Sequence, residues 1–279
     1  MSIPTHIETA NWADEHYFAY EAVNATALKQ LARNPMLYQH HLANPTKKTA
    51  SMVLGSATHC LTFEPYAWAE RYAVWDGGSR RTKAYKEWAE AHEAEGLEIL
   101  TTDEHARALE TAEAASKHPL LSELLIAKGT QVERAIVWQG LFGPCKAKLD
   151  LLHYSDQHGL VIVDLKTTSS DLDAHTLTHT MGRYLVHLQL YHYLHAACVL
   201  LNVDLGDIER VRLVALYAQT SAPHDVVACE LGPETIMQTA DLYRDLADLY
   251  DGCKTMGFWP GYDPVRTVEV PSYYTTIKK

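Results

Sequence analysis

The feature that most constrains this chain is a pair of charges set into an apolar strand pattern, VIVDLKTTSS at residues 161–170. Asp164 and Lys166 are two residues apart, so on a strand their side chains point to the same face. The segment before it, CKAKLDLLH at 145–153, also reads as a strand, and the polar turn YSDQHG joins the two. In such a hairpin Asp150 can approach Asp164 from the neighbouring strand.

Two carboxylates that converge in an apolar setting repel each other, which costs several kcal/mol unless a cation joins them. Mg²⁺ and Mn²⁺ are hard cations that prefer oxygen ligands and would relieve the repulsion. Lys166 beside such an ion can orient or deprotonate a water, or hold charge that develops on a phosphate. The alternative is an ordinary surface ion pair, which contributes ~0–1 kcal/mol. The continuous β-branched run before Asp164 favours the buried site.

Two helical patterns carry polar residues on otherwise apolar surfaces. In SMVLGSATHCLTF, residues 51–63, Gly55 and His59 are four apart and share a face, where the glycine lets a strand or ligand come close. In YLVHLQLYHYLHAACVLL, residues 184–201, Gln189 and Tyr193 also share a face. Buried amide and phenol groups need partners. Hydrogen bonds within the core would supply them, and so would a metal-bound water or a nucleic-acid backbone.

The remaining patterns predict an α/β chain. Asn24 or Thr26 can cap a helix over 24–43 that Pro35 interrupts. Further helices are predicted to about residue 94 and over 102–117, 119–127 and 233–252, and strands over 131–139, 208–218 and 224–231. Together these predict a single domain, residues 1–279, with a helical part to about residue 130. Helices flanking a central mixed sheet make up the part from about 131 to 279.

Composition narrows the classes of function. The net charge of −11 argues by itself against a nucleic-acid binder, although carboxylates also gather where a cation is bound. The five cysteines have no CxxC spacing, so we expect no zinc or iron–sulfur site and reduced thiols in the cytoplasm. No apolar run is long enough for a membrane span, and the first residues are too polar and acidic for a signal peptide.

Basic side chains that could grip an anionic strand fall in two places. Lys29 and Arg33 share one face of the first long helix, and Arg80, Arg81 and Lys83 form a basic loop. We expect one or both groups to bind a phosphate of a polyanionic partner, such as a DNA backbone or its 5′ phosphate. A solvated surface is the alternative for the loop.

Asp150 with Asp164-Leu165-Lys166 resembles the core of the PD-(D/E)xK nucleases. The Gly55-to-His59 and Gln189-to-Tyr193 segments resemble the G-xxx-H and Q-xxx-Y elements of the RecB-like branch, in the same chain order. The pieces NATALKQLARNP, GSATHCLTFEP, RTKAYKEW and FWPGY further resemble RecE-type phage exonucleases (the exonuclease VIII group). Leu149 departs from the pattern, since many relatives have a proline there.

The resemblance implies a restriction-endonuclease-like fold and a role for each matched residue. One or two Mg²⁺ (or Mn²⁺) ions would be bound by His59, Asp150, Asp164 and the backbone carbonyl of Leu165. Lys166 would activate the attacking water, and Gln189 and Tyr193 would support the site and the substrate strand. Glu133, one strand earlier, would reach a second ion or else face solvent.

The resemblance also implies an activity: Mg²⁺-dependent 5′→3′ exonuclease action on double-stranded DNA ends, leaving 3′ overhangs for recombination. Relatives of this kind often form homo-oligomeric rings and work with a single-strand annealing protein in a bacterial or phage-infected cell. The tail aromatics would be subunit contacts or core residues; they are Phe258, Trp259, Tyr262, Tyr273 and Tyr274. Alternatives are an endonuclease or single-strand exonuclease of the same fold, or a non-catalytic DNA-binding protein. A small-molecule metal hydrolase is disfavoured because no HExxH motif occurs.

Overall fold

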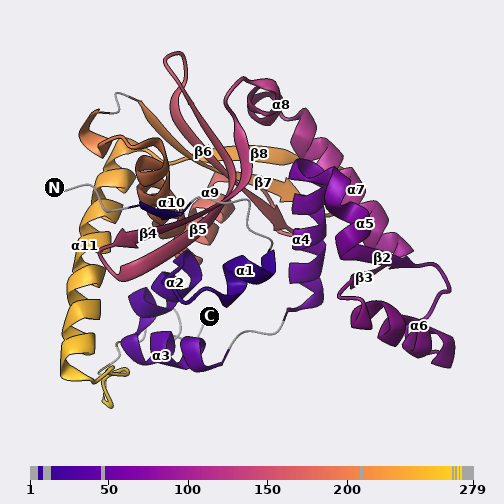
Figure 1. Ribbon diagram of the computed structural model, residues 1–279, viewed down its shortest axis with the longest axis horizontal. Helices are drawn as coiled ribbons and strands as arrows, with labels where there is room; N and C mark the ends of the chain where they lie inside the picture. The colour runs from indigo at the N-terminus through magenta and orange to yellow at the C-terminus, as the bar shows by residue number, and fades with distance from the viewer. Residues whose placement is uncertain are drawn as a thin grey trace, which may run out of the picture.

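A six-stranded mixed sheet forms the centre of the computed structural model (Figure 1), which describes residues 6–8, 14–44, 48–207, 210–265, 267, 269 and 271. Its order is β1-β4-β5-β6-β7-β8. The strands are β1 (His6–Glu8), β4 (Gln131–Gly140), β5 (Gly143–Ser155), β6 (Gly159–Thr168), β7 (Val211–Gln219) and β8 (Val226–Glu230). β6 and β7 are parallel, and all other neighbours are antiparallel. The predicted mixed sheet and its meander are confirmed.

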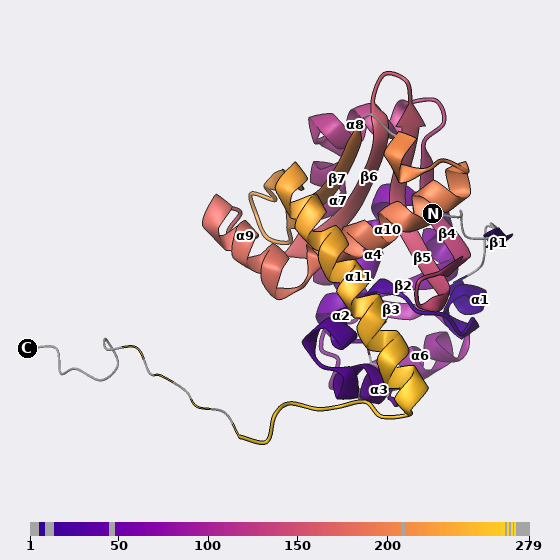
Figure 2. The same cartoon turned by 90° about the vertical axis from the view of Figure 1, so that its left-hand side faces the viewer.

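Helices cover both faces of the sheet (Figure 2). One face carries α2 (Ala25–Arg33), α10 (Val186–Leu201) and α11 (Pro233–Met256) over the largest apolar core, which includes Leu160 and Ile162. The other face carries α4 (Ala50–Phe63), α7 (Thr102–Lys117) and α8 (Pro119–Ile126), and its core includes Val161, Val163 and Leu165. Successive residues of β6 therefore enter opposite cores, which is why the strand reads as apolar throughout.

The N-terminal helices follow the predicted capping. The Asn24 side chain accepts a hydrogen bond from the Ala27 amide at 2.8 Å and so begins α2. Asn34 and Pro35 separate α2 from α3 (Pro35–Ala43), because proline fixes a first-turn conformation and cannot continue the preceding helix. The short helix α1 (Asp14–Ala19) precedes this pair. Between β6 and α10 the structure adds α9 (Ala174–Arg183), which the sequence patterns did not predict.

A small lobe with its own two-stranded sheet lies beside α4 (Figure 1). Parallel strands β2 (Tyr72–Trp75) and β3 (Glu98–Thr101) flank α6 (Lys83–Ala94) and follow η1 (Pro65–Ala67) and α5 (Trp68–Arg71). An apolar cluster that includes Leu54 and Leu100 joins the lobe to α4. The prediction that the first 130 residues are helical was wrong here, because each of these strands is only four residues long.

Gly257, at φ 64°, ends α11, and the chain that follows has no helix or strand among its described residues (Figure 2). Trp259 stacks on Tyr38 at a centroid distance of 5.0 Å, so this tail aromatic packs on the body of the protein. Phe258 and Tyr262 are exposed. Tyr273 and Tyr274 lie outside the described residues. Within the described part of the chain, no helix has the length and apolarity that a membrane span requires.

Candidate active site and metal centre

The site lies where two strands of the sheet part. β5 and β6 pair from Ser155 with Gly159 to Leu151 with Val163, and the next position along holds Asp150 and Asp164. There the ladder ends, although β5 begins at Gly143 and β6 continues to Thr168. The Leu165 amide instead donates to Asp150 Oδ2 at 2.7 Å. A side-chain carboxylate thus takes the place of a backbone acceptor, and the open fork leaves room for other groups.

Three potential ligands from separate segments converge at this fork. They are His59 of α4, Glu133 of β4 and Asp150 of β5, and one ligand atom of each lies within 4.8 Å of the others. His59 Nδ1 is 3.4 Å from Asp150 Oδ2 and 4.0 Å from Glu133 Oε1. One imidazole nitrogen and two carboxylates make a donor set suited to a hard divalent cation.

Burial and mutual charge perturb all three groups. Burial and the Asp150 charge raise the pKa of Glu133, which Lys148 partly offsets with its Nζ 2.9 Å from Glu133 Oε2. Burial opposes ionisation of Asp150 as well, but His59, Lys166 and the Leu165 amide outweigh it and lower its pKa. Burial alone would lower the pKa of His59, yet Asp150 and Glu133 raise it to about 9. Without metal, a proton on His59 therefore compensates the paired carboxylates, and a cation would fit in its place.

Glu133 reaches the cluster from a strained backbone. Its φ is 48°, in the left-handed region that non-glycine residues rarely adopt. It lies between Val132, paired with Leu151, and Arg134, paired with Leu149, where the β4–β5 ladder is interrupted. A left-handed conformation costs roughly 1–2 kcal/mol for an L-residue. The strain therefore falls on the residue whose carboxylate joins His59 and Asp150.

Gln189 connects the other charged residues of the fork. Asp164 Oδ2 pairs with Lys166 Nζ at 2.6 Å, and Asp164 Oδ1 accepts from Gln189 Nε2 at 3.0 Å. Gln189 Oε1 accepts from Lys166 Nζ at 3.3 Å and from Lys29 Nζ at 2.5 Å, while its Nε2 also donates to the Tyr193 hydroxyl at 2.8 Å. Burial raises the pKa of Asp164, although Lys166 opposes this. The amide holds the carboxylate and both lysines in one network.

The structure thus brings together His59, Asp150, Asp164, Lys166, Gln189, Tyr193 and Glu133 around one fork. The three-residue cluster includes Glu133 rather than Asp164, whose oxygens contact Lys166 and Gln189. Leu165 contributes its amide to Asp150, and the ligand role of its carbonyl stays a prediction.

Comparison with known proteins identifies the family of this chain. A family model described as "PDDEXK-like domain of unknown function (DUF3799)" matches residues 24–266. The chain belongs to this family. PD-(D/E)xK proteins are nucleases that typically use divalent metals, and the match supports that superfamily without singling out the RecE-type branch.

One solved structure agrees with the fold of this chain. A protein described as a "Putative exonuclease" from Eubacterium rectale aligns with a TM-score of 0.56 and 11% identity, covering 96% of this chain and 98% of that one. At this identity the likeness shows the fold alone. A second match, the protein SSO0001, has 16% identity over 77% of this chain and 82% of that one, with a TM-score of only 0.26. We found no match among curated proteins.

The basic residues expected to grip DNA are placed differently in this PDDEXK-like domain. Lys29 lies inside the fork, where burial and the charge of Lys166 lower its pKa to about 7, while Arg33 is exposed. Arg80 pairs with Glu104, and Lys83 lies 3.3 Å from Glu87. Arg81 is exposed on the same loop between β2 and α6. The helical spacing predicts only that Lys29 and Arg33 share a face of the helix, and the contact of Lys29 with Gln189 follows from the fold.

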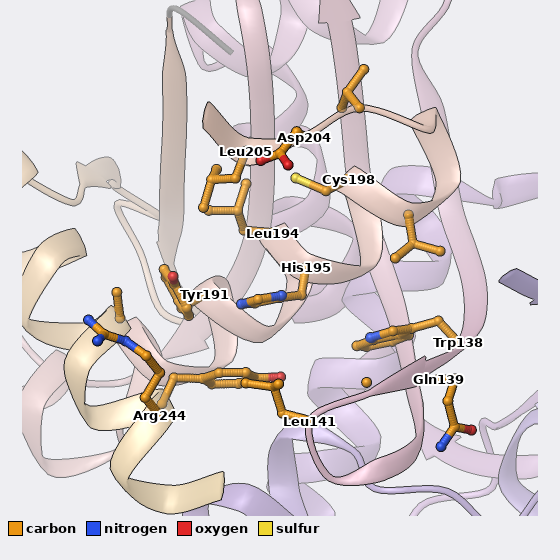
Figure 3. A pocket seen from close by; sticks show the side chains of 15 residues that line it. Trp138, Gln139, Leu141, Tyr191, Leu194, His195, Cys198, Asp204, Leu205 and Arg244 are labelled. Carbon is orange, nitrogen blue, oxygen red and sulfur yellow. The ribbon is translucent and has the colours of Figure 1, made fainter. Parts of the chain in front are cut away.

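Another cavity of the domain, whose lining is drawn in Figure 3, shares no residue with the fork. It measures about 400 Å³ and is bounded by α10, α11 and the turn between β4 and β5. Its lining is mainly apolar, and His195 stacks on Tyr243 there at a centroid distance of 4.7 Å. Burial lowers the pKa of His195 to about 4. Among the described residues that line it, Asp204 is the one carboxylate, so these residues do not supply the donor set found at the fork.

Proposed function

We propose that this PDDEXK-like domain is a metal-dependent deoxyribonuclease of the RecE type that degrades double-stranded DNA from its ends. The observation that carries the proposal is the convergence of His59, Glu133 and Asp150 within 4.8 Å beside the Asp164–Lys166 ion pair. Carboxylates and an imidazole can hold the metal ions that promote phosphodiester hydrolysis, and a nearby amine can stabilise the charge that develops on the phosphate. The Eubacterium rectale protein that shares this fold is described as a "Putative exonuclease", which favours that activity over an endonuclease.

The residues fit Mg²⁺ or Mn²⁺. His59, Glu133 and Asp150 would be the main ligands, and Asp164 and the Leu165 carbonyl would be further ligands. A bound ion would supply Lewis acidity and lower the pKa of a coordinated water. Lys166 lies 2.6 Å from Asp164 and is therefore placed to orient a water and to stabilise charge on the phosphate. Gln189 fixes that lysine, and Tyr193 fixes the amide in turn.

The polarity and partners rest on the sequence resemblance. We propose 5′→3′ digestion that leaves a 3′ overhang, a homo-oligomeric ring around the DNA, and a single-strand annealing protein that coats the overhang in the cytoplasm. Lys29, inside the fork, and Arg33, exposed one turn further along α2, are proposed to contact the strand near its 5′ phosphate. Arg81 and Lys83 are proposed to contact the backbone further from the site.

The test uses linear duplex DNA labelled at either the 5′ or the 3′ end and incubated with Mg²⁺. Early release of the 5′ label, with circular duplex left intact, is the expected result. Nicking of the circle would favour the endonuclease, and early release of the 3′ label would reverse the polarity. Binding without any cleavage would favour the non-catalytic alternative.

Two variants and a chelator then locate the chemistry. Asp164→Asn keeps the shape of a nearly fully buried side chain but removes its charge, and we expect at least about a hundredfold loss of rate. Asp156→Asn, in the exposed turn between β5 and β6, is the matched control and should keep full activity. Excess chelator should abolish cleavage and Mg²⁺ should restore it. Full Mg²⁺-dependent activity of Asp164→Asn would overturn the site assignment.

A further inference from the structure

A polar pocket of about 260 Å³ lies next to the fork, between the first turns of α4, the start of α7 and the ends of β6 and β7. Most of its lining carries hydroxyl or guanidinium groups, from Ser51, Arg107, Thr167, Thr168, Ser169 and Thr220. Parallel strands commonly present ligand sites beyond their carboxyl ends, and β6 and β7 end here side by side.

The pocket continues the same elements that form the fork. Thr167 directly follows Lys166 on β6. Ser169 lies three residues after Lys166, which is roughly 10 Å along the chain at about 3.3 Å per residue. On α4, Ser51 lies two turns before His59, roughly 12 Å along the helix axis. Gly55 lies between them, and a Cβ there would meet Thr167 Oγ1 at 3.2 Å, so α4 and β6 approach closely. A nucleic-acid strand covers this span within a few nucleotides.

The pocket holds hydrogen-bond donors that have no acceptor among the described residues. Arg107 donates through Nε to the Thr220 carbonyl at 3.0 Å and through Nη2 to the Thr220 hydroxyl at 3.3 Å. These two bonds fix the guanidinium and leave further N–H donors without a partner among the described residues. Within the same described ranges, the hydroxyls of Ser51, Thr167 and Ser169 make no hydrogen bond either. A fixed guanidinium among free hydroxyls is suited to the oxygens of a phosphate.

Charge in the pocket also favours an anion. Glu104 is the one carboxylate among the described lining residues, and its Oε2 accepts from the Thr101 amide at 2.8 Å and pairs with Arg80. That carboxylate is therefore neutralised, while Arg107 has no anionic partner among the residues that the structure describes. The pocket is a local positive site on a chain of net charge −11.

We propose that this pocket binds a backbone phosphate of the substrate strand, a few nucleotides from the bond that is cut. The inference rests on the proposed nuclease function and adds a second point at which the strand is held. Arg107 binds the phosphate, the hydroxyls of Ser51, Thr167 and Ser169 donate to its oxygens, and Thr220 positions the guanidinium. Holding the strand at two points sets its register at the metal centre.

Binding is tested in excess chelator, so that no cleavage occurs, with a fluorescent single-stranded oligonucleotide as the probe. Arg107→Gln should weaken binding about fivefold to tenfold. The slope of log affinity against log salt concentration should also become shallower by about one. Arg212→Gln is the matched control, because Arg212 pairs with Glu230 at 2.9 Å at the opposite end of β7. It should leave both quantities unchanged.

A second variant separates a loss of binding from a loss of folding. Ser51→Asp places a carboxylate in the first turn of α4, where negative charge stabilises a helix, so the melting temperature should hold or rise. The same carboxylate would repel a phosphate, and the oligonucleotide should bind at least tenfold more weakly. Unchanged affinity in both Arg107→Gln and Ser51→Asp would overturn the proposal.

A cleavage assay then locates the phosphate. Substrates that carry a single neutral methylphosphonate at successive positions should show one sensitive linkage beyond the cut, and Arg107→Gln should lose that sensitivity. An Arg107→Gln variant as sensitive as the wild type at every linkage would also count against the pocket. If the wild-type protein cuts no DNA, the nuclease proposal fails, and the binding measurements still decide whether the pocket holds a phosphate.

Discussion

Binding of Mn²⁺ by the metal-free protein is expected to strengthen about tenfold for each pH unit between pH 6.5 and 8.5. Burial alone would lower the pKa of His59, but Asp150, 3.4 Å away, and Glu133 raise it to about 9. A protonated imidazole cannot bind a metal, so each ion must displace that proton. At pH 7, two units below this pKa, roughly 1% of His59 is neutral, which weakens binding by about 2.7 kcal/mol.

Calorimetric titration measures this linkage directly. Titrations at pH 7 in buffers of different ionisation enthalpy should give at least one proton released per ion bound. His158→Gln is the control, because His158 pairs with Glu123 at 3.1 Å outside the fork, and it should release the same number of protons. His59→Gln should bind more weakly and release about one proton fewer. Equal affinity at pH 7 and pH 8 with no proton release would refute the assignment of His59 as a protonated ligand.

Three further predictions concern stability. Glu133→Gly should be more stable than Glu133→Ala by roughly 1 kcal/mol in urea denaturation, because only glycine adopts φ 48° without strain. In a strand without such strain alanine is the more stable of the two, so a more stable Glu133→Ala would contradict the strain. Leu149→Ala, at a fully buried core position, should cost roughly 2–5 kcal/mol by the same measurement, and a cost under 1 kcal/mol would mean that the core relaxes around the cavity. Thr101→Ala removes one half of the capping box of α7 and should cost about 1 kcal/mol, whereas an unchanged midpoint would show that the cap contributes nothing.

Much of the fold could be predicted because its signals are local. Asn24 and Pro35 begin and divide the first helices, and Pro233 begins α11, through contacts within a few residues. The hairpin of β5 and β6 follows from two apolar runs and one polar turn, and its register puts residues 150 and 164 at the next position after the last pair. Spacing along the chain contains this information directly.

The features that were missed depend on distant parts of the chain. β2 and β3 are short strands separated by α6, and they pair with each other and pack on α4 and α7, which lie outside the lobe. The contact of Lys29 with Gln189 spans 160 residues, so helical spacing could not reveal it. The left-handed backbone of Glu133 has no marker, because glycine and asparagine are the residues that usually signal such a conformation.

The strand fork explains why the residues that were predicted meet where they do. A continuous ladder between β5 and β6 would bond the Leu165 amide to a backbone carbonyl and place Asp150 and Asp164 in a closed sheet. Since the ladder ends at Leu151 and Val163, the freed amide binds Asp150, and α4 and α10 bring His59 and Gln189 to the opening. The parting of the strands thus exchanges backbone hydrogen bonds for a set of buried charges. Such a set is stable only if each charge has a partner, which favours binding of a cation there.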